Sequence, residues 1–225
     1  DYLYQWLDGV GHSETDYVLW DEPHFYIPGW AAPSKGTWAC HCPRCQKNYL
    51  NQYGVTLPLH TSPQISHWKS SILIEFLSDL CQINSTLNKK NALILLPNHP
   101  SKAGSIPWED IHHIKKVDIF GTDPYWIWDK QPLESYVSDF SQKTLDIANR
   151  NLWEPQIWLQ GMMIPSGQEW EMERALELTI QSGIRNISFW GYNCCHHISY
   201  TRCGDPDLAW DTLRQAVRKA AEKYA

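Results

Sequence analysis

Short apolar runs alternate with longer amphipathic segments along this chain, and this alternation limits the fold more than any other feature. The apolar runs predict strands, and the segments whose apolar residues recur at helical spacing predict helices. The predicted strands cover residues 16–20, 92–96, 117–122, 156–160 and 186–190. The predicted helices cover residues 66–84, 108–116, 133–149, 169–182 and 207–224. Repeated strand-then-helix units are typical of a parallel α/β architecture.

The five predicted units are three short of a closed (β/α)8 barrel. A single barrel domain of 225 residues is of ordinary size, so we predict one domain over residues 1–225. Residues 23–65 are the exception to the alternation, and we interpret them as a long inserted loop.

Polar and aromatic residues follow the predicted strands, where parallel α/β proteins carry their chemistry. Asp21 and Glu22 follow the first strand. We predict that Asp21, together with His24 beside the acidic pair, binds the substrate, and that the other strand ends contribute further substrate-binding residues. These are Asn98, Tyr125, Trp126, Gln160, Trp190 and Tyr192. Asp118 is expected at the opposite end of its strand, in a structural role.

The chain is rich in aromatic residues, with 13 Trp and 11 Tyr. Flat aromatic faces on loops bind sugar rings, although aromatic side chains also fill ordinary cores. The net charge of −6 is modest and charges of both signs are interspersed, which argues against nucleic-acid or membrane partners. No apolar run reaches the roughly 18 residues that span a bilayer. A neutral carbohydrate partner fits this composition.

The seven cysteines do not form a disulfide-framework pattern. Three of them, Cys40, Cys42 and Cys45, have spacing suited to one tetrahedral zinc ion, and reduced free thiols are the alternative. Cys194 and Cys195 precede two histidines, but adjacent side chains rarely converge on one ion. The pattern favours a reducing, cytoplasmic compartment, while two glycosylation sequons leave the compartment open.

The segment from residue 18 to residue 54 resembles clan A glycoside hydrolases, and among them family 42, the β-galactosidase-like enzymes. The resemblance rests on the acidic pair Asp21-Glu22, the Cys-x-Cys-x-x-Cys segment at residues 40–45, and the Tyr-Gly at residues 53–54. In that family an Asn-Glu pair ends the fourth barrel strand, and its Glu is the acid/base. The cysteine segment there leads into a helix that ends in Tyr-Gly.

The resemblance implies that Glu22 is the acid/base and that Asp21 replaces the family's Asn. It also implies an α/β fold, a TIM (β/α)8 barrel of which this chain supplies about strands four to eight. Residues 1–15 then become the tail of a preceding helix, and we expect a missing N-terminal half or a partner chain. Family members hold a structural zinc through these cysteines and one from upstream, for which His41, His12 or His24 would substitute here. No cofactor is expected for catalysis.

The chain departs from the family at the end of the strand at 156–160, which the resemblance makes strand seven. The clan places its nucleophilic Glu there, and this chain has Gln160. The alternatives for the second carboxylate are Asp123, Glu169 and Glu171. We choose Asp123 because it follows a strand beside Tyr125 and Trp126, whereas acids in a first helical turn need no other explanation.

The sequence therefore supports two main hypotheses. One is a glycoside hydrolase in which Glu22 and Asp123 flank a glycosidic bond, since such hydrolysis requires two carboxylates. The other is a non-catalytic carbohydrate-binding barrel in which Gln160 marks a lost nucleophile. A zinc-dependent hydrolase centred on residues 194–197 is a third reading.

Overall fold

The computed structural model describes residues 2–25, 40–60, 62–97, 106–198 and 200–224. It divides into two compact units, each described here by itself. The first unit comprises residues 1–89 and 98–116, and the second comprises residues 90–97 and 117–225.

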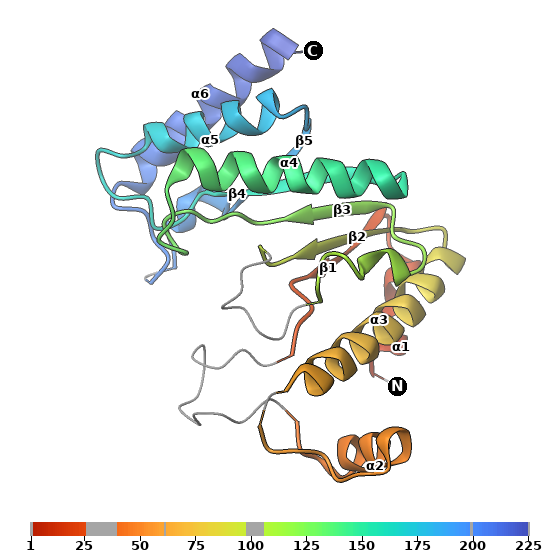
Figure 1. Cartoon of the computed structure of the whole chain (residues 1–225). Coiled ribbons are helices and arrows are strands. Elements are labelled where there is room, and N and C mark those ends of the chain that lie inside the picture. Colours follow the sequence, from red (N-terminus) through yellow and green to blue (C-terminus); the bar gives the residue numbers. More distant parts are fainter. Residues whose placement is uncertain (1, 26–39, 61, 98–105, 199, 225) are drawn as a thin grey trace. The chain divides into compact units, whose positions relative to one another are not determined.

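The second unit contains a parallel sheet with helices on one face. Its strands are β2 (Lys90–Leu95), β3 (Ile119–Thr122), β4 (Glu154–Gln160) and β5 (Asn186–Trp190). They pair in that order, all parallel. The helices α4 (Leu133–Asn151), α5 (Trp170–Gln181) and α6 (Pro206–Tyr224) lie along the same side of these strands (Figure 1). Because successive parallel strands need a crossover, each helix returns the chain to the start of a strand or closes the unit.

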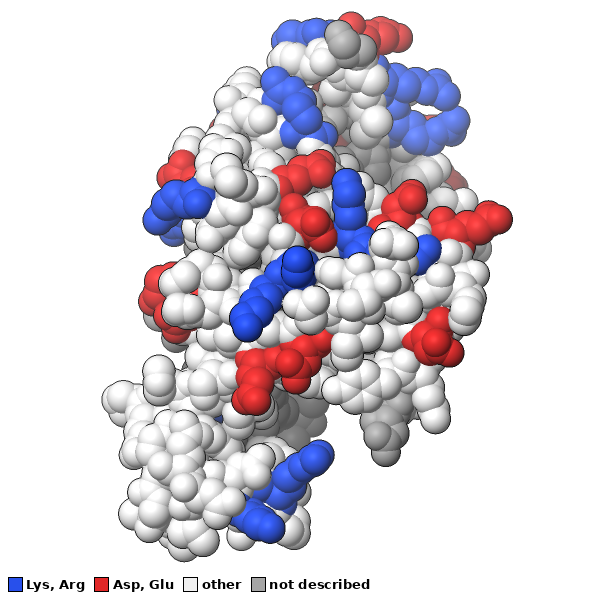
Figure 2. Space-filling model, turned by 90° about the vertical axis from the view of Figure 1, so that its right-hand side faces the viewer, with Lys and Arg blue, Asp and Glu red and all other residues white. Residues whose placement is uncertain are grey.

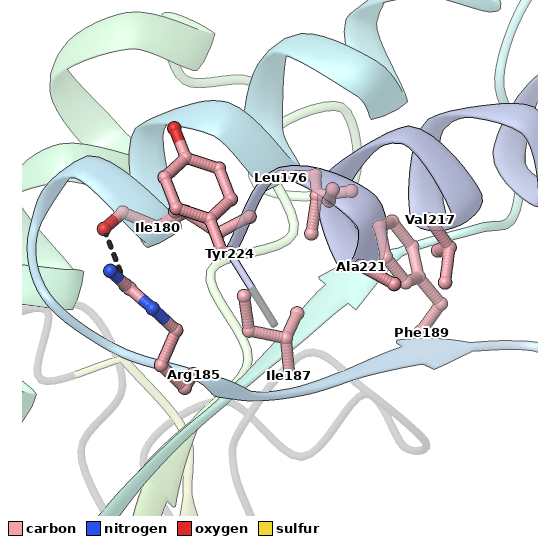
Figure 3. Close-up of a pocket in the computed structure, with 9 residues that line it drawn as sticks. Leu176, Ile180, Arg185, Ile187, Phe189, Val217, Ala221 and Tyr224 are labelled. Atoms are coloured by element: carbon pink, nitrogen blue, oxygen red, sulfur yellow. Dashed lines mark hydrogen bonds between the residues drawn. The ribbon is translucent and has the colours of Figure 1, made fainter.

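The register of β4 and β5 separates the two faces of this sheet. Ile187 and Phe189 of β5 point toward α5 and α6, where they line a hollow of about 450 Å³ with Leu176 and Val217 (Figure 3). Their register partners in β4 are Ile157 and Leu159, so these share the helix-covered face. The alternate residues form the opposite face, namely Gln156, Trp158, Gln160, Asn186, Ser188 and Trp190.

At Gly121 the backbone of β3 approaches its neighbouring strands closely. A Cβ atom built at this position would lie 2.5 Å from the backbone oxygen of Gln156 and 2.7 Å from Cδ1 of Ile94. A side chain is therefore excluded by backbone of the neighbouring strand. At the other end of β3, Asp118 accepts a hydrogen bond from the backbone N–H of Asn91 at 2.8 Å, which confirms its predicted structural role.

The first unit contains α1 (Tyr2–Gly11), β1 (Tyr17–Asp21), α2 (Pro43–Tyr53), α3 (Pro63–Thr86) and the short 3-10 helix η1 (Ile111–His113). Helix α3 begins sharply because the Ser62 hydroxyl accepts a hydrogen bond from the N–H of Ile65, with Pro63 in the first helical position. A small core joins α2 to α3. It consists of the buried residues Tyr49, Leu57, Ile65 and Trp68, with Cys45 packed at its margin.

The alternation of strands and helices predicted from the sequence is confirmed, and most bounds agree within three residues. The helix expected over residues 108–116 is wrong, because only the single turn of η1 forms there before Lys116 adopts a left-handed φ of 62°. Residues 23–65 are not a plain loop, since α2 lies within them and ends at Tyr53 before Gly54. The single barrel domain and the strand numbers four to eight stay predictions. No helix in the described ranges is both long and apolar enough to cross a membrane.

Candidate active site

The two adjacent carboxylates leave β1 in different conformations. Along β1 the side chains of Val18 and Trp20 are buried, and Asp21 lies on the alternate, exposed face. Glu22 then adopts a left-handed φ of 41°, so it departs from the strand and is only partly exposed. Desolvation, followed by the neighbouring charge of Glu22, raises the pKa of Asp21 above its usual 3.8.

His24 and Lys69 of the first unit both lie close to Phe25. The His24 ring nitrogen Nδ1 lies 2.6 Å from the backbone oxygen of Phe25, which fixes the ring beside the strand exit. Lys69 of α3 is only 4% exposed and its ammonium lies 5.8 Å from the centre of the Phe25 ring. Burial lowers the pKa of Lys69. No sequence pattern marks this lysine, because it lies in an otherwise ordinary amphipathic helix.

Asp123 follows β3 and is almost completely buried, with 3% of its surface exposed. The chain turns at once, because the N–H of Tyr125 donates to the backbone oxygen of Asp123 at 2.7 Å. The Asp123 charge also contributes to a raised pKa at Tyr136, whose main causes are burial and a hydrogen bond to Asp129. Asp123 therefore lies at a strand exit, as expected, but it is buried, and its role as the second catalytic carboxylate stays a prediction.

Trp126 does not present its ring to solvent. It is 2% exposed, and its indole N–H donates to the Oε2 atom of Glu171 at 2.6 Å. A sugar platform needs an open ring face, so this burial disfavours the predicted role of Trp126. The hydrogen bond instead fixes Glu171, the alternative second carboxylate, at the start of α5.

Gln160 is completely buried, and its amide is engaged on both sides. Its Oε1 atom accepts hydrogen bonds from the backbone N–H groups of Ile127 at 3.0 Å and Trp128 at 3.4 Å. Its Nε2 group donates to the backbone oxygen of Met162 at 2.9 Å. These bonds tie the segment after β3 to the end of β4. Gln160 therefore holds the loop that follows Asp123, and its predicted substrate contact stays untested.

Glu169, the remaining alternative carboxylate, serves its own helix. It precedes α5, is 6% exposed, and accepts the N–H of Gly167 at 3.1 Å on Oε1 and 2.9 Å on Oε2. Such local bonding near a helix start explains the acid without catalysis. The choice of Asp123 over Glu169 is consistent with this arrangement.

The end of β5 supplies exposed aromatic rings. Trp190 is 48% exposed and Tyr192 is 84% exposed. The Tyr192 ring meets the Trp210 ring of α6 edge to face, with centroids 5.4 Å apart. Trp190 is also the register partner of Gln160. These residues have the accessible faces that sugar stacking requires.

The helix-free face of β4 and β5 carries a chain of hydrogen-bonded polar side chains that was not predicted from the sequence. Asn186 donates to Glu154 at 2.8 Å, Gln156 donates to Asn186 at 2.8 Å, and the Trp158 indole donates to Gln156 at 2.9 Å. The only signal was that polar residues alternate with apolar ones in both strands. The apolar hollow of Figure 3 lies on the opposite, helix-covered face and offers little to a polar sugar.

The sulfur atoms of Cys40, Cys42 and Cys45 lie within 4.8 Å of one another. A tetrahedral zinc ion with bonds of about 2.3 Å separates two sulfur ligands by roughly 3.8 Å, so the cluster fits three zinc ligands. Hydrogen bonds from the other two cysteines lower the pKa of Cys42 to about 7, while burial raises that of Cys45 to about 12. Among the described residues no other group of three or more potential ligands converges, residues 194–197 included.

Asn98, a predicted substrate contact, lies outside the described residues. On the face drawn in Figure 2, acidic and basic side chains are interspersed, as they are in the sequence. The predicted absence of nucleic-acid and membrane partners stays a prediction.

No family model matches this chain, and no curated protein is significantly similar to it in sequence. Among solved structures, it is similar to the endo-β-1,4-mannanase from Thermotoga petrophila, with 13% identity over 66% of this chain and 40% of that chain, at a TM-score of 0.45. An endo-1,4-β-mannanase from Rhizomucor miehei matches with 9% identity over 68% and 47%, at a TM-score of 0.49.

The 3-keto-D-glucoside 4-epimerase from E. coli matches with 16% identity over 72% of this chain and 58% of that chain, at a TM-score of 0.42. This chain thus spans less than half the length of the two mannanases. At these TM-scores the likeness says nothing about residues or reaction. The specific resemblance to family 42 finds no support in these comparisons.

Proposed function

We propose that this protein is a glycoside hydrolase in which Glu22 acts as acid/base and Asp123 as the second carboxylate. The observation that carries the proposal is the position of Glu22, which leaves the sheet at the exit of β1 with a left-handed φ of 41° and follows a second carboxyl, Asp21. Acid/base cleavage of an acetal needs two carboxyl groups, one to protonate the leaving oxygen and one to attack or to activate water. The proposal requires that Glu22 and Asp123 act on one glycosidic bond.

The proposed substrate is a neutral glycan that stacks on Trp190 and Tyr192. Both rings are accessible. Ordering them on binding costs little conformational entropy, because aromatic side chains have few rotatable bonds. Loss of sugar affinity on changing Trp190 to Ala is expected whether or not the protein is an enzyme.

The deciding experiment is the Glu22→Gln variant assayed on a panel of neutral β-linked oligosaccharides. Removal of a general acid lowers turnover by about 10²- to 10⁴-fold, whereas binding depends on the stacked rings and should stay within about threefold. Glu14→Gln, which neutralises an exposed acid ahead of the same strand, is the matched control and should keep full turnover. Unchanged turnover in Glu22→Gln would contradict the assignment.

A non-catalytic carbohydrate-binding function is the second candidate. It is favoured by Gln160, whose amide bonds to three backbone groups where the resembling enzymes have their nucleophile. In that case neither the native protein nor Glu22→Gln turns over any glycan, and both bind it equally.

We also propose that the cysteine cluster holds a structural zinc ion. Cys40, Cys42 and Cys45 would bind it, and the ion would fix the start of α2 against the core at Cys45. Metal analysis of the purified protein should give one zinc per chain, and Cys42→Ser should lower this content. Absence of metal from protein purified with zinc present would leave the free-thiol reading.

A further inference from the structure

Residues 201–204, which lead into α6, are hydrogen-bonded to the loop that follows β4 and to the turn that follows β5. The N–H of Met163 donates to the oxygen of Thr201 at 2.9 Å, and the N–H of Gly204 donates to the oxygen of Ile164 at 2.8 Å. A Cβ atom at Gly204 would lie 2.5 Å from the nitrogen of Ser166, which shows how closely the two segments approach. Residues 201–204 therefore have a fixed place beside the loop that follows β4.

These hydrogen bonds place Cys203 opposite Cys194. The N–H of Cys203 donates to the backbone oxygen of Cys194 at 3.3 Å, while its thiol lies 3.7 Å from the oxygen of Gly161. Both side chains are buried: Cys194 is 0% exposed and Cys203 is 2% exposed. A single backbone N–H···O=C bond of this length keeps the two α-carbons within roughly 7 Å of each other. A disulfide spans about 4.4 to 6.8 Å, so the backbone is already suited to one.

The two thiols also contact each other, and the contact makes them chemically unequal. A hydrogen bond from the Cys194 thiol lowers the pKa of Cys203, and the same bond raises the pKa of Cys194. The thiolate is the reactive form, which favours Cys203 as the attacking sulfur.

We propose that Cys194 and Cys203 are a redox-modification site at which hydrogen peroxide produces a reversible intrachain disulfide. The Cys203 thiolate attacks one peroxide oxygen, which breaks the O–O bond, forms a sulfenic acid and releases hydroxide. The Cys194 sulfur then displaces that oxygen, which leaves as water after taking up a proton. In total, two thiols and one peroxide give one disulfide and two water molecules.

The disulfide would close a loop of residues 194–203 next to the aromatic residues at the end of β5. Cys194 belongs to the 3-10 helix η2 (Tyr192–Cys195), and that helix packs on α6. An effect of oxidation on sugar binding at Tyr192 rests on the proposed function, whereas the disulfide itself does not.

Peptide mapping of the native protein after peroxide treatment tests the proposal directly. Trypsin cleaves after Arg185, Arg202 and Arg214, so Cys194 and Cys203 fall in the separate peptides 186–202 and 203–214. The expected product is these two peptides joined, about 2 Da lighter than their sum, and separated again by a reducing agent. If both peptides stay reduced while the thiols at residues 40–45 oxidise, the proposal is wrong.

Three variants identify the pair. Cys195→Ser should keep the cross-link, since Cys195 is the adjacent buried thiol, and Cys203→Ser should abolish it. A cross-link that persists in Cys194→Ser would assign the bond to Cys195 and overturn the proposal. Should a variant fail to fold, fragmentation of the joined wild-type peptides locates the bond. Oligosaccharide affinity, compared between reduced and oxidised protein, reports separately on the regulation of the proposed sugar site.

Discussion

At the scale of single residues, Gln160 shows how a catalytic position can become a structural one. Its amide needs both a donor and two accepting lone pairs, because it bonds to Met162 on one side and to Ile127 and Trp128 on the other. A carboxylate could satisfy only the second set. The sequence identified the departure from the resembling enzymes, but it could not show what the amide does.

Replacing Gln160 with Glu should therefore destabilise the protein and should not create a better enzyme. A buried carboxylate would face the Met162 oxygen without a donor, at a cost of about 3 kcal/mol in the free energy of unfolding. Urea unfolding and glycosidase assays measure the two effects. Gln215→Glu, an exposed change on α6, is the control and should shift unfolding by less than about 0.5 kcal/mol. A gain in turnover in Gln160→Glu would contradict this account.

Asp21 should leave a mark on the pH dependence of stability. Its pKa is raised in the folded state, so the folded protein binds this proton more tightly than the unfolded chain. Stability due to Asp21 is then present below the usual pKa of 3.8 and is lost as the pH rises through the folded pKa. In Asp21→Asn, urea midpoints between about pH 4 and pH 6 should fall less steeply with rising pH. Asp16→Asn supplies the background effect of losing one exposed charge.

At the scale of elements, the strands and helices follow from periodicity, and the exceptions have local causes. The helix α3 carries its apolar residues at regular spacing, so its type was predicted. It begins at Pro63 behind the Ser62 cap, three residues before the predicted start at residue 66. The segment at 108–116 forms only one 3-10 turn, because Ile114 adopts an extended conformation directly after it, with φ −76° and ψ 120°. Trp126 and Gln160 make buried hydrogen bonds to loop residues and to the start of α5. Sequence periodicity does not predict how loops fold, so these contacts were not predicted.

Gly121, in β3, should not tolerate replacement by a residue with a side chain. A methyl group there overlaps backbone that cannot rotate away, so Gly121→Ala should lower the free energy of unfolding by about 1 to 3 kcal/mol. The same change at Gly9, which is exposed in α1 with nothing within 4 Å of the added carbon, should instead stabilise by up to about 1 kcal/mol. Equal changes in the free energy of unfolding of the two variants would contradict the role of steric overlap at Gly121.

At the scale of the whole molecule, the chain forms two compact units. A substitution that destabilises one unit should therefore increase local unfolding mainly in that unit. Trp68 is 1% exposed and packs edge to face on Tyr49 at 5.0 Å between centroids. Trp68→Ala should cost about 3 to 5 kcal/mol within the first unit. Hydrogen exchange should accelerate in residues 63–86 and stay near native rates in β3 and β4. Uniform acceleration would show that the units unfold as one.

The turn after β5 has a consequence for how this protein can diversify. Asn193, Cys194 and Cys195 all have positive φ, between 49° and 55°, a conformation that is expensive for residues other than glycine, asparagine and aspartate. Isoleucine, valine and threonine are effectively forbidden at these three positions. In a saturation library the turn would therefore accept few substitutions, while the exposed Tyr192 beside it could vary freely. New ligand preferences can arise at the ring without disturbing the backbone that presents it.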